Sequence, residues 1–118
     1  MRVPGGVKHG KRRQKVLELA KGFKGKRRTC YRIAKQSVVK ALRHQYVSRK
    51  LRKRDMRRLW MVRIGAAARG HGLSYSRFMG GLRKAGVGLN RKMLAALALR
   101  DPDAFAQVVA VAKEATGA

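Results

Sequence analysis

Apolar residues in the second half of the chain recur every three or four positions, which is the spacing of helices that bury one face. Ser74, Asn90 and Asp101 stand where a side-chain oxygen can cap a helix N-terminus, and Pro102 suits the first turn of the helix after Asp101. We find no alternation typical of a strand. The pattern therefore predicts a small all-α domain over residues 59–118, close to the lower size limit for independent folding.

The same spacing predicts where these helices lie and what they bury. One helix follows Ser74 and ends near Gly86, a second follows Asn90, and the last follows Asp101. The leucines that precede the first two caps are placed to form hydrophobic staples. We expect the core to consist of Leu59, Trp60, Ile64, Ala67, Leu73, Phe78, Leu82, Val87, Leu89, Leu94, Leu97, Phe105, Val108 and Val109.

The start of the chain carries a different pattern. Residues 1–7 contain one proline and two glycines, which is typical of an extended arm, and a first helix fits residues 8–21. Gly22 then stands where a left-handed backbone conformation closes a helix, and Phe23 is placed to fold back on Leu17.

A long uninterrupted helix is predicted next. No glycine or proline occurs between Gly25 and Gly65, so we expect one continuous helix over residues 26–70. Its length would be roughly 65 Å, whereas the radius of gyration of a compact globule of this chain length is only about 13–14 Å. Much of such a helix must therefore rest on a partner.

Apolar side chains form one stripe along the first part of this helix. The stripe consists of Cys30, Ala34, Val38 and Ala41. In residues 49–54 five of the six side chains are cationic, and we expect charge on every face there. Like charges four residues apart destabilise a helix by about 0.2–0.5 kcal/mol per pair. We therefore predict that residues 1–55 are largely disordered or frayed in the free protein and become helical on a polyanion.

The charge of the chain is strongly positive and unevenly distributed. Its formal net charge is +26, with 22 Lys and Arg against 2 acids in residues 1–59, and 9 against 3 in residues 60–118. A compact protein with this charge repels itself, so a polyanion is the expected partner. A membrane-surface helix would need an apolar face opposite its cations, and the apolar residues of 43–54 point in different directions. RNA therefore suits the pattern better than a membrane.

Basic residues are the candidates for phosphate contact, because arginine and lysine neutralise the backbone of nucleic acids. In the basic extension, residues 1–58, they are Arg2, Lys8, Lys11, Arg12, Arg13, Lys15, Lys24, Lys26, Arg27, Arg28, Arg32, Lys35, Arg43, Arg49, Lys50, Arg52, Lys53, Arg54, Arg57 and Arg58. In the small domain they are Arg63, Arg77, Lys84, Arg91 and Lys92. Two other classes fit the charge alone: a DNA-compacting architectural protein and a membrane-active cationic protein.

Other chemistry has little support in the sequence. The three histidines are far apart, the acids are few, and Cys30 is the single cysteine, so no metal set, catalytic residues or cofactor site is predicted. We expect Cys30 to pack in the apolar stripe. The segment "GFKG" (22–25) matches the backbone-gripping loop of KH domains, but a helix cap and hinge is the favoured interpretation. "GGLRKAGVG" (80–88) lacks the Lys-Ser/Thr of a phosphate loop, so these glycines are expected to end a helix and start a turn.

In its motifs the chain resembles the bacterial large-subunit ribosomal protein L-twenty family. The resemblance covers nearly the whole chain and is most specific in "KRDMRRLWMVRIGAAAR" (53–69). It is supported by "LAKGFKG" (19–25), "GLSYSRFMGGLRKAG" (72–86) and "LNRKMLA" (89–95). The family usually has asparagine where this chain has Gly65, and basic residues are common at the position of Pro4. Gly65 would therefore place a softer joint inside the long helix.

The resemblance implies a non-catalytic protein that binds large-subunit ribosomal RNA early in assembly. Its basic helical extension would thread between RNA helices, and its small helical domain would lie nearer the surface. The implied partners are this RNA and neighbouring large-subunit ribosomal proteins, without a membrane or a small-molecule substrate. The implied location is the ribosome of the cytoplasm, although organelle ribosomes carry relatives too. Some relatives also repress translation of their own messenger RNA.

Overall fold

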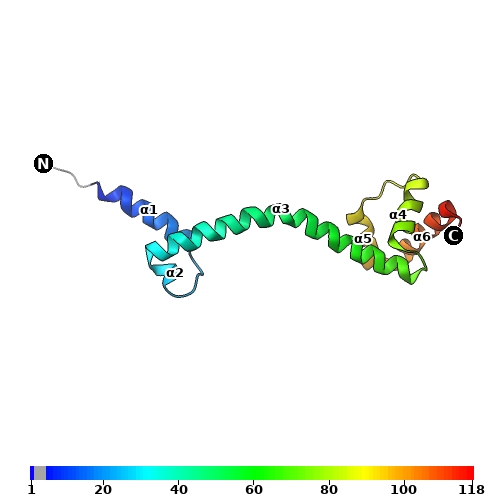
Figure 1. The fold of residues 1–118 in the computed structure, drawn as a ribbon, viewed down its shortest axis with the longest axis horizontal. Helices are drawn as coiled ribbons and strands as arrows, with labels where there is room; N and C mark the ends of the chain where they lie inside the picture. The colour runs from blue at the N-terminus through cyan, green and yellow to red at the C-terminus, as the bar shows by residue number, and fades with distance from the viewer. Residues whose placement is uncertain (2–4) are drawn as a thin grey trace. The chain divides into compact units, whose positions relative to one another are not determined.

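A computed structural model describes Met1 and residues 5–118 of the chain. It contains six helices and, over the described residues, no strand, which confirms the all-α prediction (Figure 1). The helices are α1 (Gly6–Leu19), α2 (Lys26–Thr29), α3 (Tyr31–Gly70), α4 (Tyr75–Lys84), α5 (Arg91–Arg100) and α6 (Pro102–Thr116). Contacts group the chain into an N-terminal unit, Met1–Lys50, and a C-terminal unit, Leu51–Ala118. Arg2 and Pro4 belong to the predicted extended arm, and both lie outside the described residues.

The N-terminal unit is held together by a small apolar cluster. Ala20, Ala34 and Val38 are buried, and Leu17 and Phe23 pack against them as partly buried side chains. The turn after α1 brings Phe23 back to this cluster, and Gly22 within it has a φ of +90° that favours glycine. The predicted left-handed turn after the first helix and the return of Phe23 are therefore confirmed.

The predicted continuous helix over residues 26–70 is wrong at its start. Cys30 has an extended backbone (φ −86°, ψ 113°) and separates the single turn of α2 from α3. Its N–H donates to the carbonyl oxygen of Lys26 at 2.8 Å, and its own carbonyl oxygen accepts from the N–H of Ala34 at 2.8 Å. Three of the four residues of α2 are cations and none is acidic, which the helix dipole disfavours at a helix N-terminus, and this weakens any helix that continues through it.

The break changes the environment of Cys30. The sequence placed this residue in the apolar stripe, but the structure leaves it exposed. Because the backbone is extended at Cys30, its side chain lies out of the helical register that buries Ala34 and Val38. The prediction that Cys30 packs in the stripe is therefore wrong.

From Tyr31 onwards the predicted long helix is confirmed. α3 comprises 40 residues, about 60 Å at 1.5 Å per residue, and passes without interruption through the cationic residues 49–54 and through Gly65. Gly65 is buried inside the helix, and a Cβ added there would meet Tyr75 Cβ at 3.8 Å, an ordinary contact. The softer joint expected at Gly65 stays a prediction.

Three side-chain caps begin the helices of the C-terminal unit, as the sequence predicted. Ser74 Oγ accepts from the N–H of Arg77 at 3.4 Å in front of α4. Asn90 Oδ1 accepts from the N–H of Met93 at 2.9 Å in front of α5. Asp101 Oδ1 accepts from the N–H of Ala104 at 3.0 Å, with Pro102 opening α6. These local bonds satisfy backbone donors that a helix start leaves free.

The core of the C-terminal unit is built around two aromatic rings. Phe78 of α4 and Phe105 of α6 are buried, and their ring centroids lie 5.3 Å apart. Among the described residues, the other fully buried large side chains are Ile64, Leu94 and Val109. α4 and α6 approach so closely at Gly81 that an added Cβ would lie 2.5 Å from the carbonyl oxygen of Ala112. Gly81 is thus required by packing inside α4, rather than by the turn that the sequence suggested for it.

Most of the predicted core is confirmed, with one clear error. Leu59 is 39% exposed, whereas Trp60 packs against the core as a partly buried side chain. Leu73 and Leu82 are buried. The predicted core residues that pack against the core as partly buried side chains also include Ala67, Val87, Leu89, Leu97 and Val108. The sequence reasoning missed the buried alanines Ala68, Ala95 and Ala112. Leu59 follows the apolar spacing, but its side chain points about 100° around the helix from that of Trp60. It therefore lies outside the face on which Trp60 and Ile64 meet the core.

Candidate nucleic-acid interface

The cations predicted to contact phosphate lie at the surface. Apart from Arg91, which is partly buried, and Arg2, which lies outside the described residues, all are exposed. α1 carries Lys8, Lys11, Arg12, Arg13 and Lys15; the following turn carries Lys24, and α2 carries Lys26, Arg27 and Arg28. α3 carries Arg32, Lys35, Arg43, Arg49, Lys50, Arg52, Lys53, Arg54, Arg57, Arg58 and Arg63. Arg77 and Lys84 lie on α4, and Arg91 and Lys92 on α5.

Residues 42–59 of α3, the exposed stretch, have no buried or partly buried side chain. At 3.6 residues per turn, the lysines and arginines of this stretch spread over about two thirds of the helix circumference. The remaining third carries His44, Ser48, Leu51, Asp55 and Leu59. The expectation of charge on every face was therefore too broad, because the helix leaves one narrow side without Lys or Arg.

Aromatic rings hold two of the cationic side chains in place. The guanidinium carbon of Arg13 in α1 lies 5.6 Å from the ring centre of Tyr31, and Lys50 Nζ lies 4.9 Å from that of Tyr46. Such contacts contribute about 0.5–1 kcal/mol at exposed sites. They reduce the freedom of two long side chains without neutralising them, so both charges stay available to an anion.

In the C-terminal unit the structure brings together cations that are far apart in the sequence. Lys53, Arg54 and Arg57 of α3 line a pocket of about 350 Å³ with Trp60 and Arg91. Arg91 is oriented by a hydrogen bond from its Nε to the hydroxyl oxygen of Tyr75, at 3.0 Å.

This pocket offers positive charge beside an indole ring, which suits a phosphate with its neighbouring base. The sequence analysis predicted all four cations as phosphate contacts, but it did not predict that they line the same pocket. The other predicted cations of the small domain, Arg63, Arg77, Lys84 and Lys92, are exposed.

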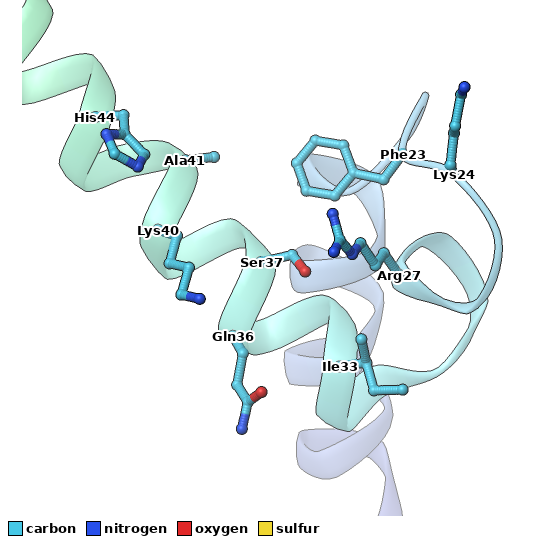
Figure 2. Close-up of a pocket in the computed structure, with 9 residues that line it drawn as sticks. All are labelled: Phe23, Lys24, Arg27, Ile33, Gln36, Ser37, Lys40, Ala41 and His44. Atoms are coloured by element: carbon cyan, nitrogen blue, oxygen red, sulfur yellow. The ribbon is translucent and has the colours of Figure 1, made fainter.

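The N-terminal unit contains a groove that the sequence did not reveal. The groove has a volume of about 500 Å³ and lies between the turn after α1, α2 and the first part of α3 (Figure 2). Of the predicted contact residues it contains Lys24 and Arg27. The other lining residues are Phe23, Ile33, Gln36, Ser37, Lys40, Ala41 and His44. The α3 residues among these recur every three or four positions, which is the signal that could have indicated a common face.

The described residues form neither a group of metal ligands nor a membrane-spanning helix. Within the described part of the chain, no three His, Cys, Asp or Glu side chains are grouped so that they could hold a metal ion. None of the described helices is both long and apolar enough to cross a membrane. What the described surface provides is dense positive charge on helices, together with aromatic rings at concave places beside Phe23, Tyr31 and Trp60.

Known proteins share this sequence over almost its full length. Residues 2–108 match the model of the family described as "Ribosomal protein L20". The chain is 58% identical over 114 residues to the large ribosomal subunit protein bL20 of Desulfosudis oleivorans, covering 97% of this chain and 98% of that protein. It is 57% identical over 113 residues to the protein of the same name in Alkaliphilus metalliredigens, covering 96% and 95%. It is 54% identical over 112 residues to that of Thermoanaerobacter pseudethanolicus, covering 92% and 94%. The resemblance inferred from the sequence is confirmed, and the chain belongs to the ribosomal protein L20 family.

Proposed function

We propose that this protein is a structural constituent of the large ribosomal subunit, which binds large-subunit ribosomal RNA directly and supports the folding of that RNA and the assembly of the subunit. Its place is then the ribosome in the cytoplasm, and its further neighbours are other large-subunit ribosomal proteins. The shared name of relatives up to 58% identical, large ribosomal subunit protein bL20, supports this proposal. The role is one of binding and requires no catalysis.

The exposed stretch is the observation that carries the RNA-binding part of the proposal. Eighteen consecutive residues of α3 are exposed, and their cations cover about two thirds of the helix circumference. A helix that packs on its own protein keeps an apolar face, and this one does not. Cations spread so widely suit a partner that surrounds the helix with phosphates on several sides.

The expected mechanism is exchange of counterions for protein cations. Each Lys or Arg that neutralises a phosphate releases a condensed counterion, so that affinity falls steeply with salt. Arginine also binds phosphate through two parallel N–H donors and stacks on exposed bases. The pocket beside Trp60 would add an oriented contact, since Tyr75 holds Arg91 in position.

A comparison of two charge-matched variants tests the role of the exposed stretch. In the first, Arg49, Lys50, Arg52 and Lys53 are changed to Gln; in the second, Arg69, Arg83, Arg100 and Lys113 are changed to Gln. Both lose four positive charges. Binding to a large-subunit ribosomal RNA fragment would be measured across a salt series. We expect the first set to lower the slope of log affinity against log salt by about 3, from roughly 0.7–0.9 per contact, and the second to change it much less.

Two results would contradict the proposal. A slope near zero for the unaltered protein would exclude binding through phosphates. Equal competition by duplex DNA at physiological salt would favour the DNA-compacting alternative instead. Sedimentation of cell extracts in a high-salt gradient adds an independent measurement, in which we expect the protein to travel with large subunits rather than free.

A further inference from the structure

The groove beside Phe23 differs in kind from the convex cationic surface, and we propose that it receives one unpaired nucleotide of the bound RNA. This inference rests on the proposed function and names the part of the RNA that one particular site would hold. It assigns to the N-terminal unit a fixed point of contact, in addition to its general attraction for phosphate.

The ring of Phe23 provides one wall for a base. Phe23 packs against the buried cluster of Ala20, Ala34 and Val38, and it also lines the groove. In Figure 2 the ring faces the side of α3 that carries Ala41 and Ser37. The ring is thus held by packing before any ligand arrives, while part of it stays accessible. Stacking on such aromatic faces is the usual way in which proteins hold unpaired bases.

Polar and charged groups complete the environment that a nucleotide needs. Gln36, Ser37 and His44 of α3 supply hydrogen-bond donors and acceptors for the edge of a base. Lys24 and Arg27 line the same groove and supply positive charge for the attached phosphate. In Figure 2 the guanidinium of Arg27 lies between the Phe23 ring and the Ser37 side of α3. Charge and stacking surface therefore occur within one concavity.

The size of the groove favours a single nucleotide over a double helix. Its volume of about 500 Å³ lies within the range of about 300–1,000 Å³ that is usual for sites of small organic ligands. Bases in a duplex are paired and stacked on one another, so a duplex can offer only its backbone to this concavity. An unpaired nucleotide at a bulge or loop can be turned out and inserted, which is the common mode of specific RNA recognition.

The experiment uses the full-length protein and two RNA hairpins that are identical except for one bulged adenosine in the stem of the first. Dissociation constants are measured by fluorescence anisotropy across a salt series. Ala41→Leu fills the groove and keeps a good helix former, while Phe23→Leu removes the stacking surface. Tyr46→Leu is the matched aromatic control for the ratio of the two affinities, because Tyr46 does not line the groove. Its ring contacts Lys50 on the exposed stretch, so any effect of this variant should be the same for both hairpins.

We expect the unaltered protein and Tyr46→Leu to bind the bulged hairpin about five- to tenfold more tightly than the paired one. Ala41→Leu and Phe23→Leu should bring this ratio close to one, with an unchanged salt slope for the paired hairpin. Circular dichroism of each variant checks folding, and Ala41→Leu keeps the test valid if loss of Phe23 disturbs the small apolar cluster.

Three outcomes would overturn the inference. If the unaltered protein binds both hairpins equally with a steep salt dependence, the groove is not a nucleotide site but the proposed function stands. If the preference for the bulge survives in Ala41→Leu, the preference arises elsewhere on the surface. If neither hairpin is bound in a salt-dependent way, both the inference and the proposed function fail.

Discussion

The exposed stretch, residues 42–59, and the C-terminal core are formed partly by the same helix but follow opposite physical rules. In the exposed stretch no side chain is covered, and cations dominate. From Trp60 onwards the same helix buries Ile64 and Ala68 against α4, α5 and α6. One helix is therefore uncovered in one part and contributes to the core of its own protein in another. The change of role takes place within a single turn, with exposed Leu59 on one side and partly buried Trp60 on the other.

The two regions differ in what stabilises their helices. The C-terminal core buries apolar side chains of several helices, and their burial stabilises it through the hydrophobic effect. The exposed stretch buries none of its side chains and adds repulsion between like charges. Its helix is therefore supported mainly by backbone hydrogen bonds and intrinsic propensity, with a small contribution from the contact of Lys50 with the Tyr46 ring.

The largest expected difference is in amide hydrogen exchange. In the protein without RNA, we expect the amides of residues 42–54 to exchange about a thousandfold faster, relative to their intrinsic rates, than those in the middle of α4 and α6. The reason is that the exposed stretch opens locally, whereas the core amides exchange only when the C-terminal unit unfolds. Strong protection across residues 40–54 without RNA would show that the helix is stable alone and would refute the predicted fraying.

Two identical substitutions compare the regions directly. Leu94 is fully buried and Leu51 is 42% exposed. We expect Leu94→Ala to lower the free energy of unfolding by about 2–5 kcal/mol through lost burial and a cavity, and Leu51→Ala to change it by at most about 0.5 kcal/mol. Urea unfolding followed by fluorescence of Trp60, the only tryptophan, reports on the core against which this residue packs. Similar losses in both variants would mean that the exposed stretch is packed in solution.

Gly80 and Gly81 are neighbours in α4 but differ in the space around them. An added Cβ at Gly81 would lie 2.5 Å from the Ala112 carbonyl oxygen, whereas one at Gly80 meets nothing within 4 Å. We expect Gly81→Ala to destabilise the C-terminal unit by about 1–3 kcal/mol, because backbone atoms of α6 would have to move. Gly80→Ala should instead stabilise it by about 0.5–1 kcal/mol through helix propensity. Thermal unfolding of the pair checks the opposite signs, and equal signs would contradict the close approach of α4 and α6.

Local signals explain which parts of the fold the sequence could predict. The caps at Ser74, Asn90 and Asp101 depend on side chains only three residues from the donors they accept, so they are visible without tertiary structure. The extended backbone at Cys30 was missed because no glycine or proline marks it. The buried Ala112 was missed because its role depends on Gly81 of another helix, a contact that no single-helix pattern encodes.

In the candidate sites, too, contacts between separate elements could not be predicted from the sequence. The distribution of charge predicted Lys53 and Arg91 as contact residues. It did not predict that both line one pocket with Trp60. The groove beside Phe23 was invisible, because it requires the turn after α1 to face a particular side of α3. Residue type predicts which surface is cationic, whereas the concave places on that surface depend on how separate elements meet.

The smallest expected effect concerns Gly65, where α3 continues past Trp60 into the core. Glycine lowers helix stability by about 0.5–1 kcal/mol relative to alanine, and an added Cβ would meet only Tyr75 Cβ at an ordinary 3.8 Å. We therefore expect Gly65→Ala to stabilise the C-terminal unit by up to that amount, as measured by urea unfolding with Trp60 fluorescence. Gly10→Ala, the same change within α1 of the N-terminal unit, is the control and should leave this transition unchanged. A loss of stability in Gly65→Ala would mean that glycine is needed there to let the helix bend, and the softer joint suggested by the sequence would then be a structural requirement.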